Sequence, residues 1–373
     1  MSNPFNLEKI CSLFNLNGEF IEYKRNTNGH INSTFILTFN EDGNIKKYVL
    51  QKISTEIFKN PVGLMNNIVG VTKHIRKKND DMNTPWASRC TLTFLPTTDG
   101  KYFYLDEENS CWRVYEFIDD VYTCNTIENL SDFYNAGVAF GEFQNLLADY
   151  DSSSLVETIP NFHNTVSRFA DLKKAIEENK SGRLDNVKEE VEFAIAREKD
   201  THILVDLIAE GNLPLRVTHN DTKLNNILFD NATNKGICII DLDTVMPGLS
   251  LYDFGDSIRF GANTAAEDEK DISKVSLDLE LYEAYVKGYL SSAKDALTDL
   301  EKELLPFGAK LMTYECGIRF LADYLNGDVY FHTDYADHNL VRARTQFALV
   351  ADMEKKMDEM LKITKKYCWI HKN

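Results

Sequence analysis

Three features are missing from this sequence: long apolar runs, an excess of basic residues and closely paired cysteines. The longest apolar runs, such as residues 237–240, fall far short of the roughly 20 residues that a membrane-spanning helix needs. The 373 residues carry a net charge of −17, which argues against nucleic acid as a partner because phosphate backbones are bound by basic surfaces. The sequence therefore predicts neither a membrane partner nor a nucleic-acid partner.

The cysteines and the first residues indicate the cellular compartment. The seven cysteines are scattered and odd in number, without a C-x-x-C pair, which favours reduced thiols in a cytosol. Residues 1–8 lack the basic and apolar segments of a signal peptide. We therefore expect a cytoplasmic protein.

The chain does contain enough apolar residues, 43% of the sequence, for a sizeable core. Its first part is mainly β in pattern, with predicted strands at 20–25, 34–39, 46–53, 91–95, 101–105 and 112–117 and a helical stripe over 64–77. The remainder predicts long helices at 129–149, 166–179, 184–210, 278–291, 301–325 and 344–366, with one short β region over 216–243.

This change of character predicts an α+β protein of two lobes. A small β-rich N-terminal lobe would span residues 1–115, a hinge would span 116–120, and a larger, mainly helical lobe would span 121–373. We expect the functional site in the cleft between the lobes, with its catalytic residues in the second lobe.

The most informative stretch, residues 217–226, reads V-T-H-N-D-T-K-L-N-N. It matches H-x-D-x-x-x-x-N, the catalytic-loop pattern of kinases, with His219, Asp221 and Asn226 in register. In that chemistry Asp221 accepts the proton of the attacking hydroxyl, and Asn226 reaches a metal ion on the phosphates. The loop therefore predicts phosphoryl transfer from ATP with Mg²⁺, unless Asp221 and Asn226 only make turn hydrogen bonds.

A second metal ligand is expected beside Asn226, on a predicted β-hairpin. Pairing Asp230 with Ile237 would place Asn226 opposite Asp241, since paired positions in an antiparallel hairpin have a constant sum. Directly opposed side chains lie roughly 4.5–5.5 Å apart at Cβ, close enough to share one cation. Asp241 is therefore the predicted ligand, and Asp243, two residues on and pointing the same way, is a second.

For three other polar residues the sequence gives either a structural role or a choice between two roles. Asp253 belongs to a literal Asp-Phe-Gly, but it lies beyond a Pro-Gly turn, and we expect it to cap a helix or to anchor the catalytic loop. His219 is expected to be a buried scaffold that hydrogen-bonds backbone. Lys223 either donates to the γ-phosphate as charge develops or is merely solvated.

In the first lobe, the polar turn 26–34 joins two predicted strands. Its Asn28 and Gly29 would cover phosphates with backbone N–H groups, or form an ordinary hairpin turn. On the third strand, alternation with Val49 directs Gln51 inward, at the position where protein kinases place a lysine. The predicted helix over 64–77 contains no acidic residue, so the lysine–glutamate pair of the protein kinases is absent or replaced.

Glu116 and Ile118 follow the last predicted strand of this lobe. A backbone hinge there would hydrogen-bond adenine; a plain linker is the alternative reading.

The chain resembles the aminoglycoside phosphotransferase and choline kinase superfamily, and within it the N-acetylhexosamine 1-kinases. The resemblance covers most of the length and rests on residues 216–228, 239–248, 252–262, 317–330 and 338–346. The first two stretches identify the superfamily, and the last two point to its sugar-kinase branch.

This resemblance implies a protein-kinase-like fold, ATP and Mg²⁺, and transfer to the anomeric hydroxyl of N-acetylglucosamine or N-acetylgalactosamine in amino-sugar metabolism. It implies that Asp221 is the base, that Asn226 and Asp241 bind the metal, and that Arg319 and Tyr330 contact the sugar. Some members of the family carry a glutamate in the first-lobe helix, where this chain has Val69.

The proposed sugar contacts also have a physical basis. Arg319 and Asp323 are i, i+4 neighbours on a predicted helix, and Tyr330 follows closely. Planar donors, carboxylates and aromatic faces suit a ring of hydroxyls, although an ordinary ion pair explains Arg319 and Asp323 equally well.

Two other functions remain open at this point. One is a kinase of the same superfamily for another alcohol, such as choline, homoserine or an aminoglycoside, since an acidic chain suits a cationic substrate. The other is a nucleotide-binding module without catalysis, which the missing lysine–glutamate pair would allow. The presence of Asp221, Asn226 and Asp241 together argues against the second.

Overall fold

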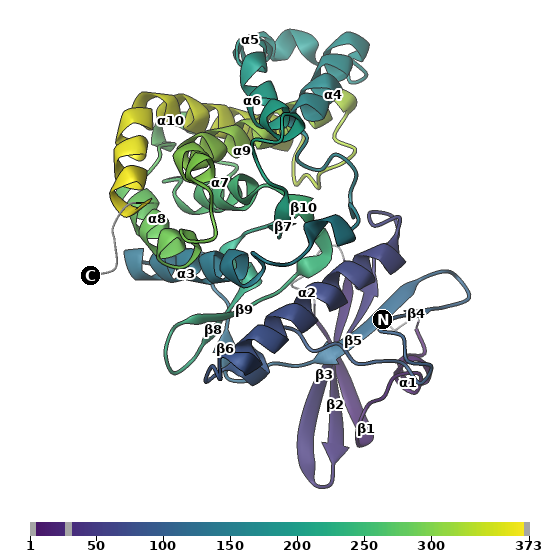
Figure 1. The fold of residues 1–373 in the computed structure, drawn as a ribbon. Helices are drawn as coiled ribbons and strands as arrows, with labels where there is room; N and C mark the ends of the chain where they lie inside the picture. Colours follow the sequence, from purple (N-terminus) through teal and green to yellow (C-terminus); the bar gives the residue numbers. More distant parts are fainter. Residues whose placement is uncertain (1–4, 27–31, 369–373) are drawn as a thin grey trace.

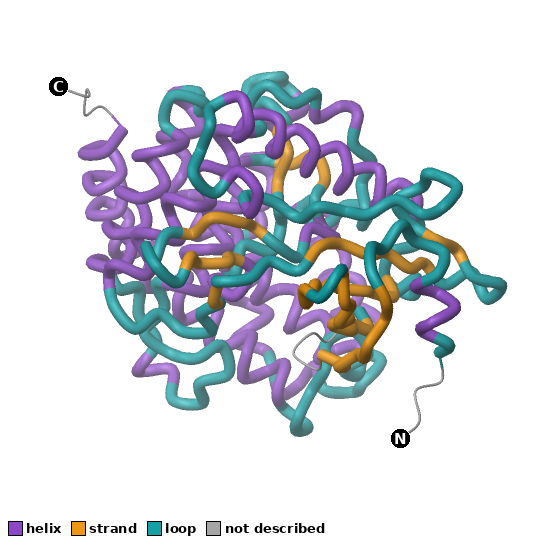
Figure 2. The backbone as a smooth tube through the Cα atoms, turned by 90° about the horizontal axis from the view of Figure 1, so that it is seen from below, coloured by secondary structure: helices purple, strands orange, loops and turns teal. Residues whose placement is uncertain are grey.

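The computed structural model describes residues 5–26 and 32–368. A sheet-rich N-terminal lobe stands beside a larger lobe built mainly of helices (Figure 1). Seen from below, most helices crowd one side of the molecule and the larger sheet lies on the other (Figure 2). The predicted α+β fold with two kinase-like lobes is confirmed.

The N-terminal lobe is built on a five-stranded antiparallel sheet of order β1-β2-β3-β5-β4. Asp42 and Gly43 join β2 to β3 with φ of 53° and 90°, the positive values that a two-residue type I′ hairpin requires. The strands are β1 (Glu19–Asn26), β2 (Ser33–Glu41), β3 (Asn44–Ile53), β4 (Tyr104–Leu105) and β5 (Cys111–Glu116).

The two faces of this sheet contribute to different cores. One face packs on the short helix α1 (Leu7–Cys11), through buried residues such as Leu50 and Trp112. The other face lies toward α2 (Pro61–Asp81), whose buried residues form one continuous core with the second lobe. Helix α2 therefore packs against the second lobe as well as against its own sheet.

A buried asparagine fastens α2 to the second lobe. The Asn67 side chain is 2% exposed; its Nδ2 donates to the carbonyls of Val156 (2.7 Å) and Val245 (2.9 Å), and its Oδ1 accepts from the Val156 N–H (3.0 Å). Val245 belongs to the segment that follows the predicted metal ligands. The three bonds thus connect the first-lobe helix directly to the candidate site.

The second lobe is a helical assembly in which α3 packs on α8, and α9 packs on α4, α7 and α10. Helices α3 and α8 approach closely at Gly137 and Gly288, where an added Cβ would lie 2.5 Å or less from backbone oxygens of the facing helix. The helices are α3 (Leu130–Leu146), α4 (Thr165–Glu178), α5 (Lys188–Ile195), α6 (Glu198–Ala209), α7 (Ser250–Gly261), α8 (Leu279–Ala293), α9 (Asp299–Asn326) and α10 (His338–Cys368). Among the described residues, no helix combines the length and apolarity needed to cross a membrane.

Two small sheets between these helices carry the candidate catalytic residues. One is β6-β8-β9 and the other is the pair β7-β10. The strands are β6 (Val121–Tyr122), β7 (Arg216–Thr218), β8 (Ile227–Asp230), β9 (Gly236–Ile239) and β10 (Met246–Gly248).

Three predicted elements differ in the structure, one of which is the strand predicted at 101–105, shortened to the two residues of β4. The strand predicted at 91–95 is reduced to an isolated bridge between Phe94 and Tyr115. The helix predicted over 184–210 is divided into α5 and α6, because α5 packs against α10 whereas α6 packs against α4. Arg197, at the break, forms an ion pair with Glu354 of α10 (2.7 Å).

Glu301 forms a buried polar centre that joins β7, α7 and α9, and it gives a test of the fold. Its fully buried carboxylate accepts from Arg216 (2.6 and 2.7 Å), from the Ser250 hydroxyl (2.8 Å) and from the Thr298 N–H (2.7 Å). We expect Glu301→Ala to lower the free energy of unfolding by about 3–5 kcal/mol, since Arg216 keeps a buried charge without its partner.

Urea unfolding of the two proteins measures this loss. The exposed Glu303 on the same helix provides the control, since Glu303→Ala should change stability by less than about 0.5 kcal/mol. Similar losses in both variants would show that the Glu301 network does not stabilise the fold.

Candidate active site

The loop that carries Asp221 is held by buried hydrogen bonds. His219 is fully buried; its Nε2 donates to the Ile240 carbonyl (2.8 Å), and its Nδ1 accepts from the Asp221 N–H (3.2 Å). This confirms the scaffold role predicted for His219. Because these bonds use both ring nitrogens, His219 positions the backbone of Asp221.

Asp253 anchors the same loop from α7. Its buried carboxylate accepts from the N–H groups of His219 (2.8 Å) and Asn220 (2.8 Å), and from Gln144 Nε2 (3.1 Å). Burial raises the pKa of Asp253, which the basic ring of His219 and the two backbone bonds partly offset. The predicted anchoring role is thus confirmed; Leu249, not Asp253, occupies the N-cap position of α7.

Asp221, Lys223 and Asn226 converge at the mouth of this loop. Lys223 Nζ lies 2.8 Å from Asp221 Oδ1, and Asn226 Nδ2 donates to the Asp221 carbonyl (2.8 Å) and to Oδ2 (3.3 Å). Burial opposes the charge of Lys223, but the Asp221 carboxylate holds the pKa of this lysine above its usual value. The Asp221 side chain remains 29% exposed, so a small hydroxyl compound has access to it.

The hairpin after this loop exists, but the predicted register is wrong by one residue. Ile227 pairs with Ile239, and the Ile240 N–H donates to the Asn226 carbonyl (2.9 Å), so Asn226 lies opposite Ile240 and not Asp241. A register shift between Leu228 and Phe229 accommodates the turn, where the Asp230 carboxylate accepts from two backbone N–H groups. Asn226 itself ends a 3₁₀ turn.

Asp241 nevertheless adjoins Asp221. It has φ of 58°, a left-handed conformation uncommon for a non-glycine residue, directly before a 3₁₀ turn over 242–244. Alternation along a strand therefore does not apply between Asp241 and Asp243. Burial raises the pKa of Asp241 to about 6, and the like charges of Asp243 and Asp221 add to the shift.

This crowding of carboxylates suits a divalent cation. Mg²⁺ is usually held by one or two carboxylates and keeps several waters, and Asp241 with the Asn226 amide oxygen meets that need. Among the described residues, no group of three or more His, Cys, Asp or Glu side chains is placed to hold a metal ion by itself. Asp241 and Asn226 therefore fit a metal ion whose other ligands come from a bound nucleotide and water.

The carboxylate of Asp243, the second predicted metal ligand, is bound by side chains of the first lobe. Its carboxylate forms a buried ion pair with Arg113 Nη1 and accepts from Asn32 Nδ2 (2.5 Å). Sequence reasoning missed Arg113, because only the pairing of β5 with β3 brings it opposite Gln51. The structure thus adds a buried cation to the cleft.

Gln51 faces the cleft as alternation predicted, and Lys52 lies on the opposite face, over the rings of Phe5 (4.5 Å) and Trp112 (5.8 Å). The α2 residue beside the Arg113 guanidinium is Met65, whose sulfur lies 3.9 Å from Nη1.

The other first-lobe residues considered from the sequence are not placed at the cleft by the structure. Val69, matched by resemblance to the helix glutamate, lines a separate surface groove with Thr72 and Phe94. The predicted phosphate-loop residues Asn28 and Gly29 lie outside the described residues.

The predicted hinge connects β5 to the second lobe. Glu116 ends β5, where its N–H donates to the Thr93 carbonyl (3.0 Å) and its carboxylate lies 3.5 Å from Lys46 Nζ. In the described part of the chain, the backbone of Ile118 has no hydrogen-bond partner, which leaves it available to an adenine edge. The adenine role of both residues stays a prediction.

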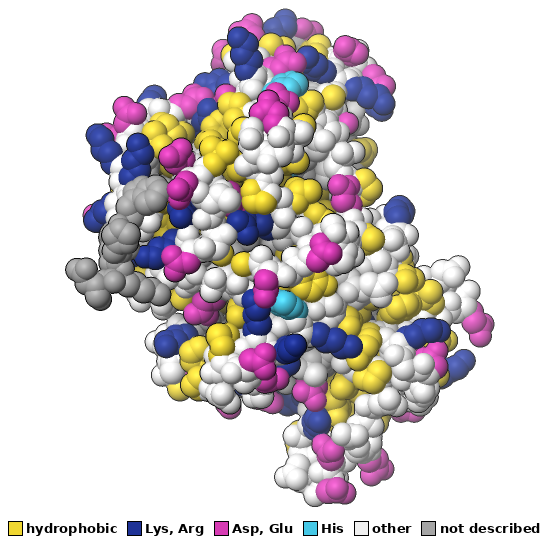
Figure 3. All heavy atoms as spheres, viewed as in Figure 1, with side chains coloured by type: hydrophobic (Ala, Val, Ile, Leu, Met, Phe, Trp, Pro, Cys, Tyr) yellow, Lys and Arg dark blue, Asp and Glu magenta, His cyan; other side chains and the backbone are white. Residues whose placement is uncertain are grey.

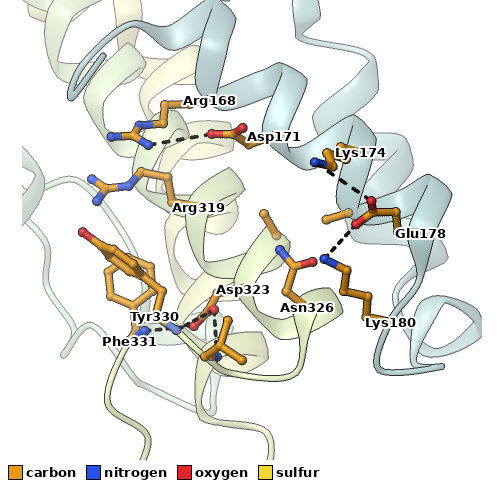
Figure 4. A pocket seen from close by; sticks show the side chains of 13 residues that line it. Arg168, Asp171, Lys174, Glu178, Lys180, Arg319, Asp323, Asn326, Tyr330 and Phe331 are labelled. Atoms are coloured by element: carbon orange, nitrogen blue, oxygen red, sulfur yellow. Dashed lines mark hydrogen bonds and ion pairs between the residues drawn. The ribbon is translucent and has the colours of Figure 1, made fainter. Parts of the chain in front are cut away.

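A pocket of about 290 Å³ lies between α4, α9 and the segment after α9 (Figure 4). Arg319 and Tyr330, both predicted from the stretch 317–330, come together there: the guanidinium carbon lies 5.9 Å from the Tyr330 ring centre and 5.6 Å from that of Phe331. Arg168 of α4, which sequence reasoning missed, extends alongside Arg319 (Figure 4).

Asp323 lines this pocket but does not pair with Arg319. Its buried carboxylate accepts from the backbone N–H groups of residues 329–331 (2.9–3.0 Å) and from Asn339 (2.9 Å), which fixes the segment that presents Tyr330. Arg319 instead lies 3.7 Å from Glu315. The i, i+4 ion pair considered from the sequence is therefore wrong.

Charged residues of α7 also support the catalytic loop. The Asp256 carboxylate accepts from the Thr222 N–H (3.1 Å) and from Arg259 (2.8 and 3.0 Å). Burial raises the pKa of Cys316 on α9 to about 11, and the charges of Arg259 and Arg319 oppose this rise. The pocket and the catalytic loop both belong to the second lobe.

The two lobes and the catalytic loop define a kinase-like phosphotransferase. Residues 22–300 match the phosphotransferase enzyme family, and the chain belongs to that family.

Solved structures share the fold across nearly the whole chain. An aminoglycoside phosphotransferase from Alicyclobacillus acidocaldarius is 11% identical, with a TM-score of 0.58, over 96% of this chain and 98% of that one. A spectinomycin phosphotransferase in complex with ADP and spectinomycin is 12% identical, with a TM-score of 0.56, over 96% and 100%. Choline kinase from Cryptosporidium parvum is 15% identical, with a TM-score of 0.52, over 98% and 99%. At these identities the likeness concerns the fold alone.

Proposed function

We propose that this protein is a cytoplasmic kinase that uses ATP and Mg²⁺ to phosphorylate the anomeric hydroxyl of N-acetylhexosamines. The observation that carries the proposal is the accessible Asp221 carboxylate, held beside Lys223 and Asn226 by a buried scaffold. The neighbour structure that contains ADP supports ATP as the donor. All seven cysteines are free thiols, which agrees with a reducing compartment.

The chemistry follows from the positions of these side chains. ATP with Mg²⁺ would supply the transferable γ-phosphoryl group, and Asn226 and Asp241 would hold the metal ion. Asp221 accepts the proton of the attacking hydroxyl through a carboxylate oxygen, and Lys223 Nζ lies 2.8 Å from that carboxylate. Lys223 then lies where it donates to the phosphoryl oxygens as charge develops.

The lobes would divide this work. Residues 1–115 would bind the nucleotide phosphates, residues 116–120 would contact adenine through the free Ile118 backbone, and residues 121–373 would hold the acceptor.

The pocket between α4 and α9 favours a neutral acceptor rich in oxygen. Arg168 and Arg319 project into it side by side (Figure 4). Burial lowers the pKa of Arg168, and repulsion from Arg319 lowers it further, while Asp171 lies 3.8 Å from Arg168 and Glu315 lies 3.7 Å from Arg319. A sugar ring would accept hydrogen bonds from both and stack on Tyr330, whereas a choline or aminoglycoside cation would be repelled.

We expect Arg319→Ala to lower kcat/KM for the sugar by about 10²-fold, because a shift of about 1 Å in the reacting oxygen has that effect. The KM for ATP should stay within about twofold, since Arg319 lies outside the nucleotide cleft. Steady-state kinetics with each substrate varied in turn measures both. Arg344 on the exposed side of α10 is the matched control, and Arg344→Ala should leave both constants unchanged. Equal damage to the two substrates would contradict the assignment of Arg319 to the acceptor.

The acceptor itself is tested with a panel of N-acetylglucosamine, N-acetylgalactosamine, choline, homoserine and an aminoglycoside. A 1-phosphate product shows phosphorus coupling to the anomeric proton in NMR. A 6-phosphate, or turnover of choline alone, would show that the enzyme phosphorylates another small alcohol. Nucleotide binding without turnover of any acceptor would identify a non-catalytic module.

A further inference from the structure

Three inward-facing residues form a row across the cleft face of the first-lobe sheet. Thr34 of β2 pairs with Gln51 of β3, and Gln51 pairs with Arg113 of β5. Gln51 Nε2 donates to the Thr34 hydroxyl (3.0 Å), and Gln51 Oε1 accepts from Arg113 Nε (2.9 Å) and Nη2 (2.7 Å). The row fixes one edge of the guanidinium and directs its Nη1 toward the second lobe.

A buried guanidinium needs an anion, and Asp243 supplies it here. Arg113 is 3% exposed; burial alone would lower its pKa, but Asp243 reverses this effect and Asp241 adds to the reversal. The Asp243 carboxylate also accepts from Asn32, at the end of the predicted phosphate-covering turn. Two donors from the first lobe therefore converge on one carboxylate, beside the residue that we assign to the metal.

We propose that Arg113 is the phosphate-binding cation of the first lobe, with Gln51 as its positioning residue and Asp243 as the carboxylate that pairs with it until phosphate binds. It would take the place of the third-strand lysine of protein kinases, from the neighbouring strand, and Gln51 would take the place of the helix glutamate. When the nucleotide binds, a phosphate oxygen replaces the Asp243 carboxylate at Nη1, and Asp243 is released toward the metal. A guanidinium held along one edge suits this exchange, because its planar fork binds carboxylates and phosphates alike.

The inference rests on the nucleotide half of the proposed function and is independent of the acceptor. Isothermal titration with ADP and with adenosine, each without Mg²⁺, tests it directly. Arg113→Met should weaken ADP binding by about ten- to a hundredfold and leave adenosine binding unchanged, and Arg113→Lys should restore part of the loss. The matched control is Lys52→Met, on the opposite face of the sheet, which should change neither affinity.

A second variant separates competition from simple support of the fold. If Asp243 competes with phosphate for Arg113, then Asp243→Asn should strengthen ADP binding without Mg²⁺ severalfold. If Arg113→Met does not fold because Asp243 loses its partner, the double variant Arg113→Met with Asp243→Asn removes the unpaired charge and is measured instead.

Three results would overturn the proposal: an unchanged ADP affinity in Arg113→Met, an equal loss for adenosine, or weaker ADP binding in Asp243→Asn. A wild-type chain that binds neither ADP nor ATP would instead refute the proposed function itself. The two failures are therefore distinguishable in the same titrations.

Discussion

Asp221→Asn is expected to lower kcat by about 10²- to 10⁴-fold, the usual contribution of a positioned general base. The amide keeps the size of the side chain and its contact with Asn226, but it cannot accept the proton of the attacking hydroxyl. The affinity for ATP should remain within about threefold, because the scaffold of His219 and Asp253 holds the loop independently of the Asp221 carboxylate.

Single-turnover kinetics and nucleotide titration measure the two quantities separately. Asp358→Asn, at an exposed position on α10, is the control for loss of one surface charge and should be fully active. A decrease of less than tenfold in the Asp221 variant would mean that another group takes the proton.

The second large effect concerns the metal. Asp241→Ala should abolish the increase in nucleotide affinity that Mg²⁺ provides, since it removes the only carboxylate near Asn226 that has neither an ion-pair nor a hydrogen-bond partner among the described residues. Asp253→Ala should keep that increase. It should instead lower stability, since the buried N–H groups of His219 and Asn220 lose their acceptor at a cost of about 1–3 kcal/mol each.

Titration of ATP with and without Mg²⁺, together with thermal unfolding, distinguishes the two variants. The expected pattern is a metal defect in one and a stability defect in the other. A larger metal defect in Asp253→Ala would reverse the assignment and make the Asp-Phe-Gly segment the metal site.

The local parts of this structure could be predicted from the sequence because short-range patterns determine them. The spacing from His219 to Asn226 predicted the catalytic loop, and alternation on β3 correctly placed Gln51 toward the cleft and Lys52 away from it. The hairpin was also correct as an element. Its register was not, because the turn capped by Asp230 introduces a shift that strand pairing alone does not reveal.

Contacts between residues far apart in the sequence explain why the other predictions were wrong or incomplete. Arg113 reaches the cleft only because β5 pairs with β3, and no local pattern around Arg113 predicts a contact with Asp243, 130 residues away. The i, i+4 spacing suggested an ion pair between Arg319 and Asp323. The structure instead uses the buried Asp323 carboxylate to accept from the N–H groups of residues 329–331, and Arg319 lies near Glu315.

The attachment of α2 through Asn67 has a consequence for regulation. In protein kinases the corresponding helix moves to switch the enzyme on and off, because its glutamate must approach the third-strand lysine. Here three hydrogen bonds of the buried Asn67 tie α2 to the backbone at Val156 and Val245, and the α2 residue beside Arg113 is the uncharged Met65. We therefore expect an enzyme in which this helix has no on–off state.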